Sequence, residues 1–528
     1  MRSTFSGLEL ARRALESQQT ALDISGHNIA NANTPGYTRQ IANLQQTVPS
    51  SIPSMGHNLS IGTGVTVASI ERARDLFVDR QFRWETSKQQ YWEGREDALV
   101  KIEGLLNEPS DNSLHDDLDK FWNSWSELSK NPENMGARSV VLERAASVAD
   151  TLHHIDQQIT EMQKGLDSNI RVQIHQVNVY AQQIEDLNTQ IKRAEVSGDN
   201  PNDLKDKRDA IVDELSKIVN LRVVESRDNT FTDREVNIFK LYIGSDSKAN
   251  QILVDDTSGY RLIEPAPPGA DGLPFADVRW ESGHPAIDPD ITNPDRDVVD
   301  LGDKLGKLQA NLLMRGSTLS SSDPVISAKE SAYLVNLRKK YDTLATGIAE
   351  AVNRIHAEGV AKAGEGIVGY TVFDFFIPDG TGAITAGNIK VNSELTGNPW
   401  AIATGETEYG DGNIAKAISS LSSGWQGYLE VISPATDIPV DAISFGDYYG
   451  AAIAEMGVDV QQATRMKEGQ DVLVTHMLNQ RESLSGVSLD EEMTNLVKYQ
   501  KSYSAAARVV TMMDDMLDTI VNRMGMTR

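Results

Sequence analysis

The chain has 528 residues, which is enough for three or four domains that each bury a core of their own. Its 50 Lys and Arg against 76 Asp and Glu give a formal net charge of −26, which argues against nucleic acid or an anionic membrane as a partner. It has no cysteine, which excludes disulfides, cysteine nucleophiles and thiolate metal sites, and it shows neither a run of 18 apolar residues nor a cleavable signal peptide.

The N-terminal segment, residues 1–71, is predicted to begin with an amphipathic helix. Leu8, Leu15, Leu22 and Ile29 recur every seven residues and form one apolar seam. The helix runs into the stretch SGHNIANANTPGYTRQ, residues 25–40. There Pro35-Gly36 suits the two central positions of a type II turn, so we expect the chain to reverse into a strand from Gln40.

Residues 72–220 are predicted to form an elongated helical bundle. From Val141 the apolar residues step by four and three, which indicates one long packed helix ending near Gly198. Helical spacing also marks 77–106, 114–128 and 202–219. Between Leu166 and Val177 the apolar residues are mostly four positions apart, which predicts a stutter, a local unwinding of the supercoil, in the seam.

The middle of the chain is predicted to be mixed α and β. Short apolar runs mark strands in a β-rich insertion, 221–320, which also holds seven prolines within thirty residues. A long helix in 321–363 returns to the bundle, and a second β-rich segment occupies 364–450. The fold class expected is therefore multidomain and mainly α, with β-rich inserted domains, terminal coiled-coil helices and mixed α/β outer domains.

The C-terminal segments are predicted to be a bundle helix, 451–487, and a heptad helix, 488–528, that pairs with the N-terminal one. Gly486 ends the first helix and Ser488 caps the second, with Glu491 completing a capping box. Six apolar residues recur every seven along the second helix: Leu489, Leu496, Tyr503, Val510, Leu517 and Met524. Residues 1–40 and 489–528 together hold nine bases and nine acids, so the whole charge of −26 lies between them.

Signals for catalysis are weak along the whole sequence. The nine histidines include no metalloprotease spacing, and His153 and His154 lie on different faces of their helix. An acidic loop from Asp288 to Asp300 lacks the spacing and glycine of an EF-hand. We therefore expect no catalytic residue, no cofactor and no metal. An ordinary pair of intramolecular helices stays open as the plain alternative for the two terminal seams.

The stretch SGHNIANANTPGYTRQ resembles the N-terminal signature of the bacterial flagellar axial proteins, which include the rod, hook and hook-associated proteins. Two further segments resemble the FlgK family of first hook-associated proteins: LSGVSLDEE, 484–492, and DLKDKRDAIVDELSKIVNLRVVE, 203–225. The family motif residues are Asn28, Ile29, Ala30, Asn31, Asn33, Thr34, Pro35, Gly36 and Tyr37.

The resemblance implies a structural protein that leaves the cell through the flagellar type III export channel and assembles between hook and filament. The partners it implies are copies of the chain in a ring, hook protein, the second hook-associated protein and an export chaperone, with no nucleic acid and no membrane. It implies that the two terminal helices pair in the inner layer of the axial tube. The matching interface residues are Leu8, Leu15, Leu22, Ile29, Leu489, Leu496, Tyr503, Val510 and Leu517. Two other interpretations stay open: another axial subunit such as hook protein, and an enzyme domain inserted in the middle.

Overall fold

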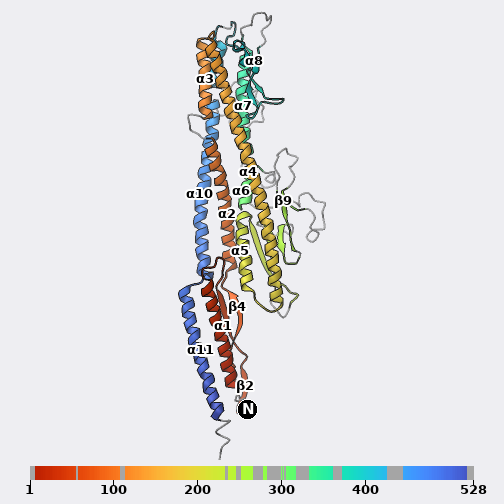
Figure 1. Cartoon of the computed structure of the whole chain (residues 1–528), viewed down its shortest axis with the longest axis vertical. Helices are drawn as coiled ribbons and strands as arrows, with labels where there is room; N and C mark the ends of the chain where they lie inside the picture. Colours follow the sequence, from red (N-terminus) through yellow and green to blue (C-terminus); the bar gives the residue numbers. More distant parts are fainter. Residues whose placement is uncertain are drawn as a thin grey trace, which may run out of the picture.

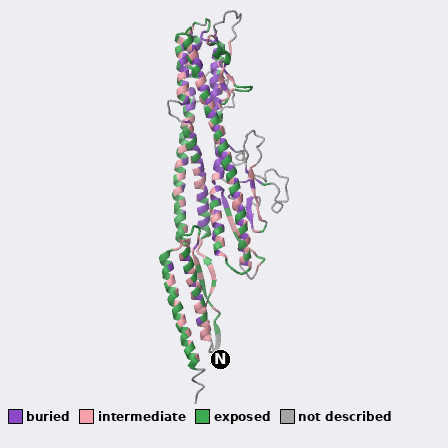
Figure 2. Cartoon of the chain, viewed as in Figure 1, coloured by how far each residue is buried: buried purple, intermediate pink, exposed green. Residues whose placement is uncertain are grey.

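The computed structural model shows an elongated molecule with a short terminal module at one end of a long helical rod (Figure 1). It describes residues 6–54, 57–106, 113–231, 236–244, 251–257, 259–265, 278–281, 299, 301, 305–316, 332–360, 372–408, 410–424 and 444–519. Figure 2 shows that buried residues are concentrated in the rod, whereas the terminal module is mostly exposed or half-buried.

The terminal module contains both ends of the described chain. It consists of helix α1 (Ser6–Asn31), helix α11 (Leu489–Asp518) and the strands β1 (Gln40–Gln46), β2 (Ser50–Ser54), β3 (His57–Ile61) and β4 (Val65–Arg72). Strands β1 and β4 pair antiparallel, with a bulge between Asn43 and Leu44, and β2 pairs with β3. Helix α1 packs on α11 and on the β1–β4 hairpin, so it lies between them (Figure 1).

The rod is built around one helix of 62 residues, α4 (Met135–Val196), which is about 93 Å long at 1.5 Å per residue. The Asn134 side chain caps its start, and Gly198, at a φ of 87°, follows its end. The seam predicted from Val141 onward is confirmed, because its apolar residues are buried, except Met162, Leu187 and Ala194, which are partly buried. The other rod helices are α2 (Leu76–Leu106), α3 (Leu114–Lys130), α5 (Asn202–Ile218), α6 (Lys307–Arg315), α7 (Tyr333–Ala357) and α10 (Phe445–Ser485).

Two hydrophobic cores share α4. The first contains α4 residues up to Leu166 and packs against α2, α3, α7 and α10, and the second begins at Ile170 and packs against α5 and a β-sheet. The strands predicted from Leu221 onward are confirmed in that sheet, whose order is β5 (Leu221–Arg227), β6 (Asn237–Ile243), β7 (Ile252–Asp255) and β8 (Gly259–Tyr260). Strands β9 (Ile263–Pro265) and β10 (Val278–Trp280) form a separate pair.

The far end of the rod carries a small cap, residues 372–424. It contains strands β11 (Phe376–Pro378) and β12 (Ile389–Val391) and the short helices α8 (Ser393–Gly397), η4 (Pro399–Ala401) and α9 (Asn413–Ser420). The segment 364–450 was expected to be β-rich, but its described residues contain only these two three-residue strands, and α8, η4 and α9 make up more of its regular structure. Asn392 caps α8 directly after β12, so this strand ends there. The division of the chain into the seven predicted segments stays a prediction.

Two buried side chains hold the cap to the rod. Arg138 of α4 donates to the carbonyl oxygens of Pro132 and Ile402, each at 2.8 Å, and burial lowers the pKa of Arg138 to about 10. His356 of α7 bonds the Phe373 carbonyl through Nδ1 at 3.0 Å and accepts the Ala403 N–H at Nε2, at 2.8 Å. The Nε2 contact requires a neutral imidazole, and burial lowers the pKa of His356 to about 4.

The His356 contacts predict that the cap loses stability in acid. The folded-state pKa of about 4 lies below the ordinary 6.5, so the stabilisation is complete above pH 6.5 and is lost as pH falls through 4. The full loss in the free energy of unfolding between these two pH limits is about 3 kcal/mol. We expect His356→Gln to be less stable than the parent at pH 7.5, and the gap to narrow toward pH 4. Denaturant unfolding at several pH values measures the stability difference between the two proteins. A difference that stays constant with pH would contradict the neutral, pH-sensitive role of His356.

Candidate assembly site

The terminal helix pair is the part of the structure where the predicted interface residues lie. Helices α1 and α11 pack side by side along their lengths (Figure 1). The contact is close at Gly7, where a Cβ atom would lie 2.2 Å from Cε of Met513. A larger residue at position 7 would therefore displace the Met513 side chain.

None of the nine predicted interface residues is fully buried in the structure. Leu8, Leu15, Leu22 and Ile29 on α1 are half-buried, as are Leu496, Val510 and Leu517 on α11. Leu489 and Tyr503 are exposed, at 49% and 37%. The buried positions of the two helices are instead small or polar: Ala11, Ser17, Ala21, Ser25, Asn28 and Glu492. The pair thus leaves much of its apolar surface uncovered in the single chain.

The motif that follows α1 folds as a corner between helix and strand. The predicted type II turn is confirmed by a bond from Tyr37 N–H to the Thr34 carbonyl, 3.2 Å, and by a φ of 79° at Gly36. The Asn28 side chain closes the corner, because its Oδ1 accepts from Tyr37 Oη at 2.7 Å and from Gln40 N at 3.0 Å. The Asn31 Nδ2 donates to the His27 carbonyl at 3.0 Å.

Not every motif residue takes part in these bonds. Ala30, Asn33 and Pro35 are exposed on the outside of the corner, and Ile29 belongs to the helix seam. Burial and the nearby Asp203 and Asp206 raise the pKa of Tyr37, so its hydroxyl stays protonated and keeps its bond.

The corner docks on α5 of the rod. The backbone N–H of Thr38 donates to Asp206 Oδ2 at 2.9 Å, and Gln40 donates to Asp203 at 2.8 Å. A Cβ atom on Gly36 would lie 3.2 Å from Cβ of Ala210. The motif therefore positions the terminal module against the rod, and a groove of about 480 Å³ remains between them.

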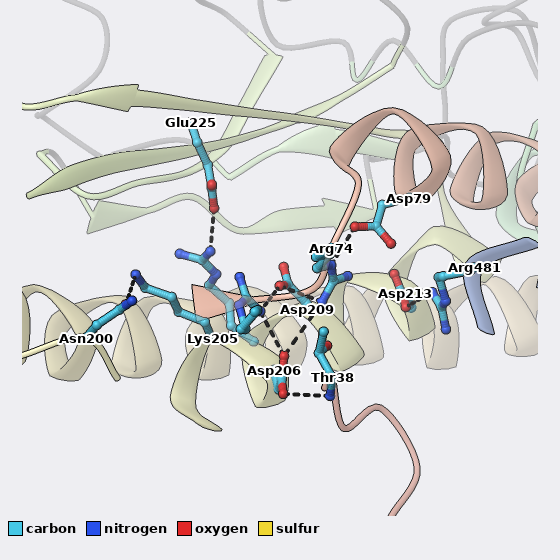
Figure 3. A network of polar contacts seen from close by, with 12 residues as sticks. Thr38, Arg74, Asp79, Asn200, Lys205, Asp206, Asp209, Asp213, Glu225 and Arg481 are labelled. Carbon is cyan, nitrogen blue, oxygen red and sulfur yellow. Dashed lines mark hydrogen bonds and ion pairs between the residues drawn. The ribbon is translucent and has the colours of Figure 1, made fainter. Parts of the chain in front are cut away.

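A cluster of buried and partly buried charges lies beside this corner, and we call it the joint cluster: Arg72, Arg74, Arg83, Asp206, Asp209, Asp213 and Arg481. Figure 3 shows Arg74, Asp206, Asp209, Asp213 and Arg481 of this cluster. The Asp209 carboxylate accepts from Arg72 and Arg74, each at 2.8 Å. Burial alone would raise the pKa of Asp209, but the surrounding guanidinium groups outweigh it and hold that pKa well below its usual range.

Arg39 ties the C-terminal helix to the same corner. Its Nε lies 2.8 Å from buried Glu492, its Nη1 lies 2.7 Å from Glu491, and its backbone N–H donates to the Ser485 carbonyl at 2.9 Å. The predicted cap at Ser488 is confirmed, since its side chain accepts the Glu491 N–H, whereas the Glu491 carboxylate pairs with Arg39 instead of completing the capping box. The first residues of α11 are thereby fixed relative to the N-terminal motif.

The sequence analysis did not single out the exposed apolar residues of α11 that lie outside the predicted seam. They form two groups, Met493 and Val497 near the start of the helix and Val509, Met512 and Met516 near its end. The stretch between the groups contains Lys498, Lys501 and Arg508. The heptad repeat identifies only the seam and gives no signal for these positions.

The described residues also bear on the expectations for metal sites and membrane spans. They contain no group of three or more His, Asp or Glu placed to hold a metal ion, and no helix among them is long and apolar enough to cross a membrane. The acidic loop from Asp288 onward lies outside the described residues, apart from Val299.

Three family models match the chain. Residues 99–373 match the helical domain of flagellar hook-associated protein FlgK. Residues 8–38 match the flagella basal body rod protein, and residues 479–524 match the C-terminal part of the rod proteins FlgEFG. The last two matches cover α1 with its corner and the end of α10 with α11.

Individual proteins match over nearly the whole chain. Flagellar hook-associated protein 1 of Bacillus subtilis (strain 168) is 34% identical over 543 residues, covering 99% of both proteins. That of Escherichia coli (strain K12) is 25% identical, covering 97% of this chain and 98% of its own length. The solved structure of the flagellar hook junction protein FlgK from Burkholderia pseudomallei has a TM-score of 0.56 at 14% identity, covering 77% of this chain and all of that one. The last comparison supports the fold.

Proposed function

This chain belongs to the FlgK family of flagellar hook-associated proteins, and we propose that its terminal module is the part that joins it to the flagellar axis. As a member of that family it is a structural protein of the hook–filament junction, an extracellular part of the bacterial flagellum, and not an enzyme. It assembles with other flagellar axial proteins. The whole-length matches to hook-associated protein 1 favour the junction protein over hook protein.

The specific partners are part of the proposal. They are copies of the chain in a ring, hook protein on one side, the second hook-associated protein on the other, and an export chaperone before assembly. The near-neutral ends support it, because residues 1–40 and 489–528 carry equal numbers of bases and acids. Close packing of these ends therefore brings no net charge repulsion.

The observation that carries the proposal is the incomplete burial of the terminal pair. The rod buries large residues such as Trp125 and Phe121 completely, whereas the fully buried positions of α1 are only small or polar. Burial contributes about 25 cal/mol per Å² of apolar surface, so the isolated pair gains little against the entropy of ordering two helices. Neighbours in the assembly would cover the remaining surface.

Incomplete burial predicts that the terminal pair becomes stable only on assembly. In the dilute monomer, we expect amide hydrogens of α1 and α11 to exchange rapidly while those of α4 are protected. In isolated flagella, the same terminal amides should become protected. Hydrogen exchange followed by mass spectrometry measures both states. Full protection of both terminal helices in the monomer would contradict coupled folding and assembly.

Deletion of the gene tests the function as a whole. We expect electron microscopy of the deletion strain to show hooks without filaments, and the culture medium to contain unassembled flagellin. Missing hooks would place the protein in the hook or rod instead. Normal flagella would contradict a role at the junction.

A further inference from the structure

We infer that Arg39 is a positioning residue for assembly, because it determines where the C-terminal helix α11 lies along the N-terminal helix α1. It does so by preventing the short break between α10 and α11 from becoming helical. The inference rests on the proposed function, since the placement of α11 matters for assembly only if the terminal module joins the chain to the flagellar axis.

The break between α10 and α11 contains only Gly486, Val487 and Ser488. Helical bonding reaches its first residue, since the Gly486 N–H donates to the Glu482 carbonyl at 2.7 Å. The φ values of Gly486 and Ser488, −71° and −82°, are close to those of a helix, and ψ values of 156° and 111° make the backbone extended there. Gly486 is not left-handed, unlike Gly198 after α4. Rotation of the linker backbone would therefore join α10 and α11 into one helix.

A continuous helix would move α11 along α1. The four steps from Ser485 to Leu489 cover about 6 Å in a helix and up to about 14 Å in an extended chain. Joining the helices would therefore draw α11 toward the rod and remove its sideways displacement from the end of α10, which Figure 1 shows. The apolar seam gives little resistance, because its leucines are half-buried or exposed and the buried positions of α1 are small or polar.

The backbone of Arg39 occupies the break. In a continuous helix, the Ser485 carbonyl would accept a hydrogen bond from the N–H of Leu489. In the structure, that carbonyl accepts from the Arg39 N–H at 2.9 Å. The Arg39 carbonyl in turn accepts from the Ala73 N–H at 2.8 Å, directly after strand β4. The group that caps the end of α10 therefore belongs to the folded N-terminal corner.

The side chain of Arg39 selects one placement of α11. Glu492 is the buried residue of α11, with its side chain 3% exposed, and it lies 2.8 Å from Arg39 Nε. Glu491 lies 2.7 Å from Nη1 of the same guanidinium group. A buried carboxylate without a cation is costly. Moving α11 toward the rod would replace both carboxylates by uncharged residues and then by Lys498, so the charges favour the observed placement.

Disulfide cross-linking can measure the placement of α11, because the natural chain has no cysteine. A Cβ atom on Gly7 would lie 3.8 Å from Cγ of Met513, so Gly7→Cys with Met513→Cys is close enough for a disulfide within one chain. Gly7→Cys with Met516→Cys reports a shift of α11 toward the rod by about one helical turn. Isolated flagella would be oxidised, and the linked and unlinked chains separated on denaturing gels without reductant.

We expect the disulfide from Met513→Cys, and little from Met516→Cys, while Arg39 is present. In Arg39→Gln the ratio of the first product to the second should fall at least about tenfold, because the buried Glu492 carboxylate loses its cation. Arg12→Gln is the matched control, since Arg12 also contacts two glutamates, but within α1 and with its side chain 53% exposed. This control should leave the ratio unchanged.

The outcomes separate this inference from the proposed function. An unchanged ratio in Arg39→Gln would overturn the inference. If Arg39→Gln does not assemble, charge reversal replaces it: Arg39→Glu and Glu492→Arg should each give hooks without filaments, and the two together should restore filaments. Filaments in either single variant, or none in the double variant, would also overturn the inference. Absence of the unsubstituted protein from isolated flagella would instead contradict the proposed function.

Discussion

Replacing Asp209 by Asn is expected to lower the free energy of unfolding by about 3–5 kcal/mol, which is the usual cost of removing one partner from a buried ion pair. Asp209 is 6% exposed and accepts from Arg72 and Arg74, and Arg83 lies 3.6 Å away. The neutral amide would leave the positive charge of these guanidinium groups partly uncompensated. Urea unfolding of the full-length protein measures the loss.

A matched control lies on the same helix. Glu214 pairs with Lys217, but their side chains are 53% and 44% exposed, so Glu214→Gln should cost less than about 1 kcal/mol. Equal losses from Asp209→Asn and Glu214→Gln would show that the joint cluster does not stabilise the fold.

The joint cluster also predicts acid sensitivity. The folded-state pKa of Asp209 lies below its ordinary value, so its contribution is complete above about pH 4 and is lost as the pH falls further. Asp209→Asn removes this titration. We expect the parent and the variant to converge in stability at low pH.

Replacing Met513 by Asp is expected to prevent filament assembly. Met513 contacts the start of α1 at Gly7, and the new carboxylate would lie in the apolar seam next to Asp514 and Asp515. Placing a polar group there without a partner costs about 2 kcal/mol, which is roughly a thirtyfold loss in pairing for each copy. The negative charge near the C-terminus of α11 adds to the cost.

Electron microscopy and motility assays measure this effect. We expect hooks without filaments in cells that carry only Met513→Asp. Ser504→Asp introduces the same charge at an exposed polar position of α11 and should leave filaments normal. Normal filaments in both strains would show that the seam between α1 and α11 is dispensable, and loss in both would indicate a general effect of charge on the helix.

Local patterns in the sequence predicted the elements that depend on neighbours along the chain. The seam of α4, the turn at Pro35-Gly36 and the cap at Ser488 are all confirmed. Each depends on residues a few positions apart, where helical spacing, a left-handed glycine or a side-chain cap determines the conformation.

The joint cluster could not be predicted in this way. Arg72 and Asp209 are 137 positions apart, and Arg481 is 268 positions from Asp213. No periodicity identifies such pairs among 126 charged residues, 50 of them basic and 76 acidic. The burial of the predicted seam residues likewise depends on how closely α1 and α11 pack. The sequence pattern does not determine the distance between the two helices.

The 62-residue helix α4 has a mechanical consequence, because it runs without interruption through both hydrophobic cores. A bending or twisting load applied at one end passes along a continuous ladder of backbone hydrogen bonds, without crossing a hinge between domains. Gly165, a helix-interior glycine, lies just before Leu166, where the first core ends, and glycine costs a helix roughly 1 kcal/mol relative to alanine. Bending of the rod under load should therefore be concentrated at that residue.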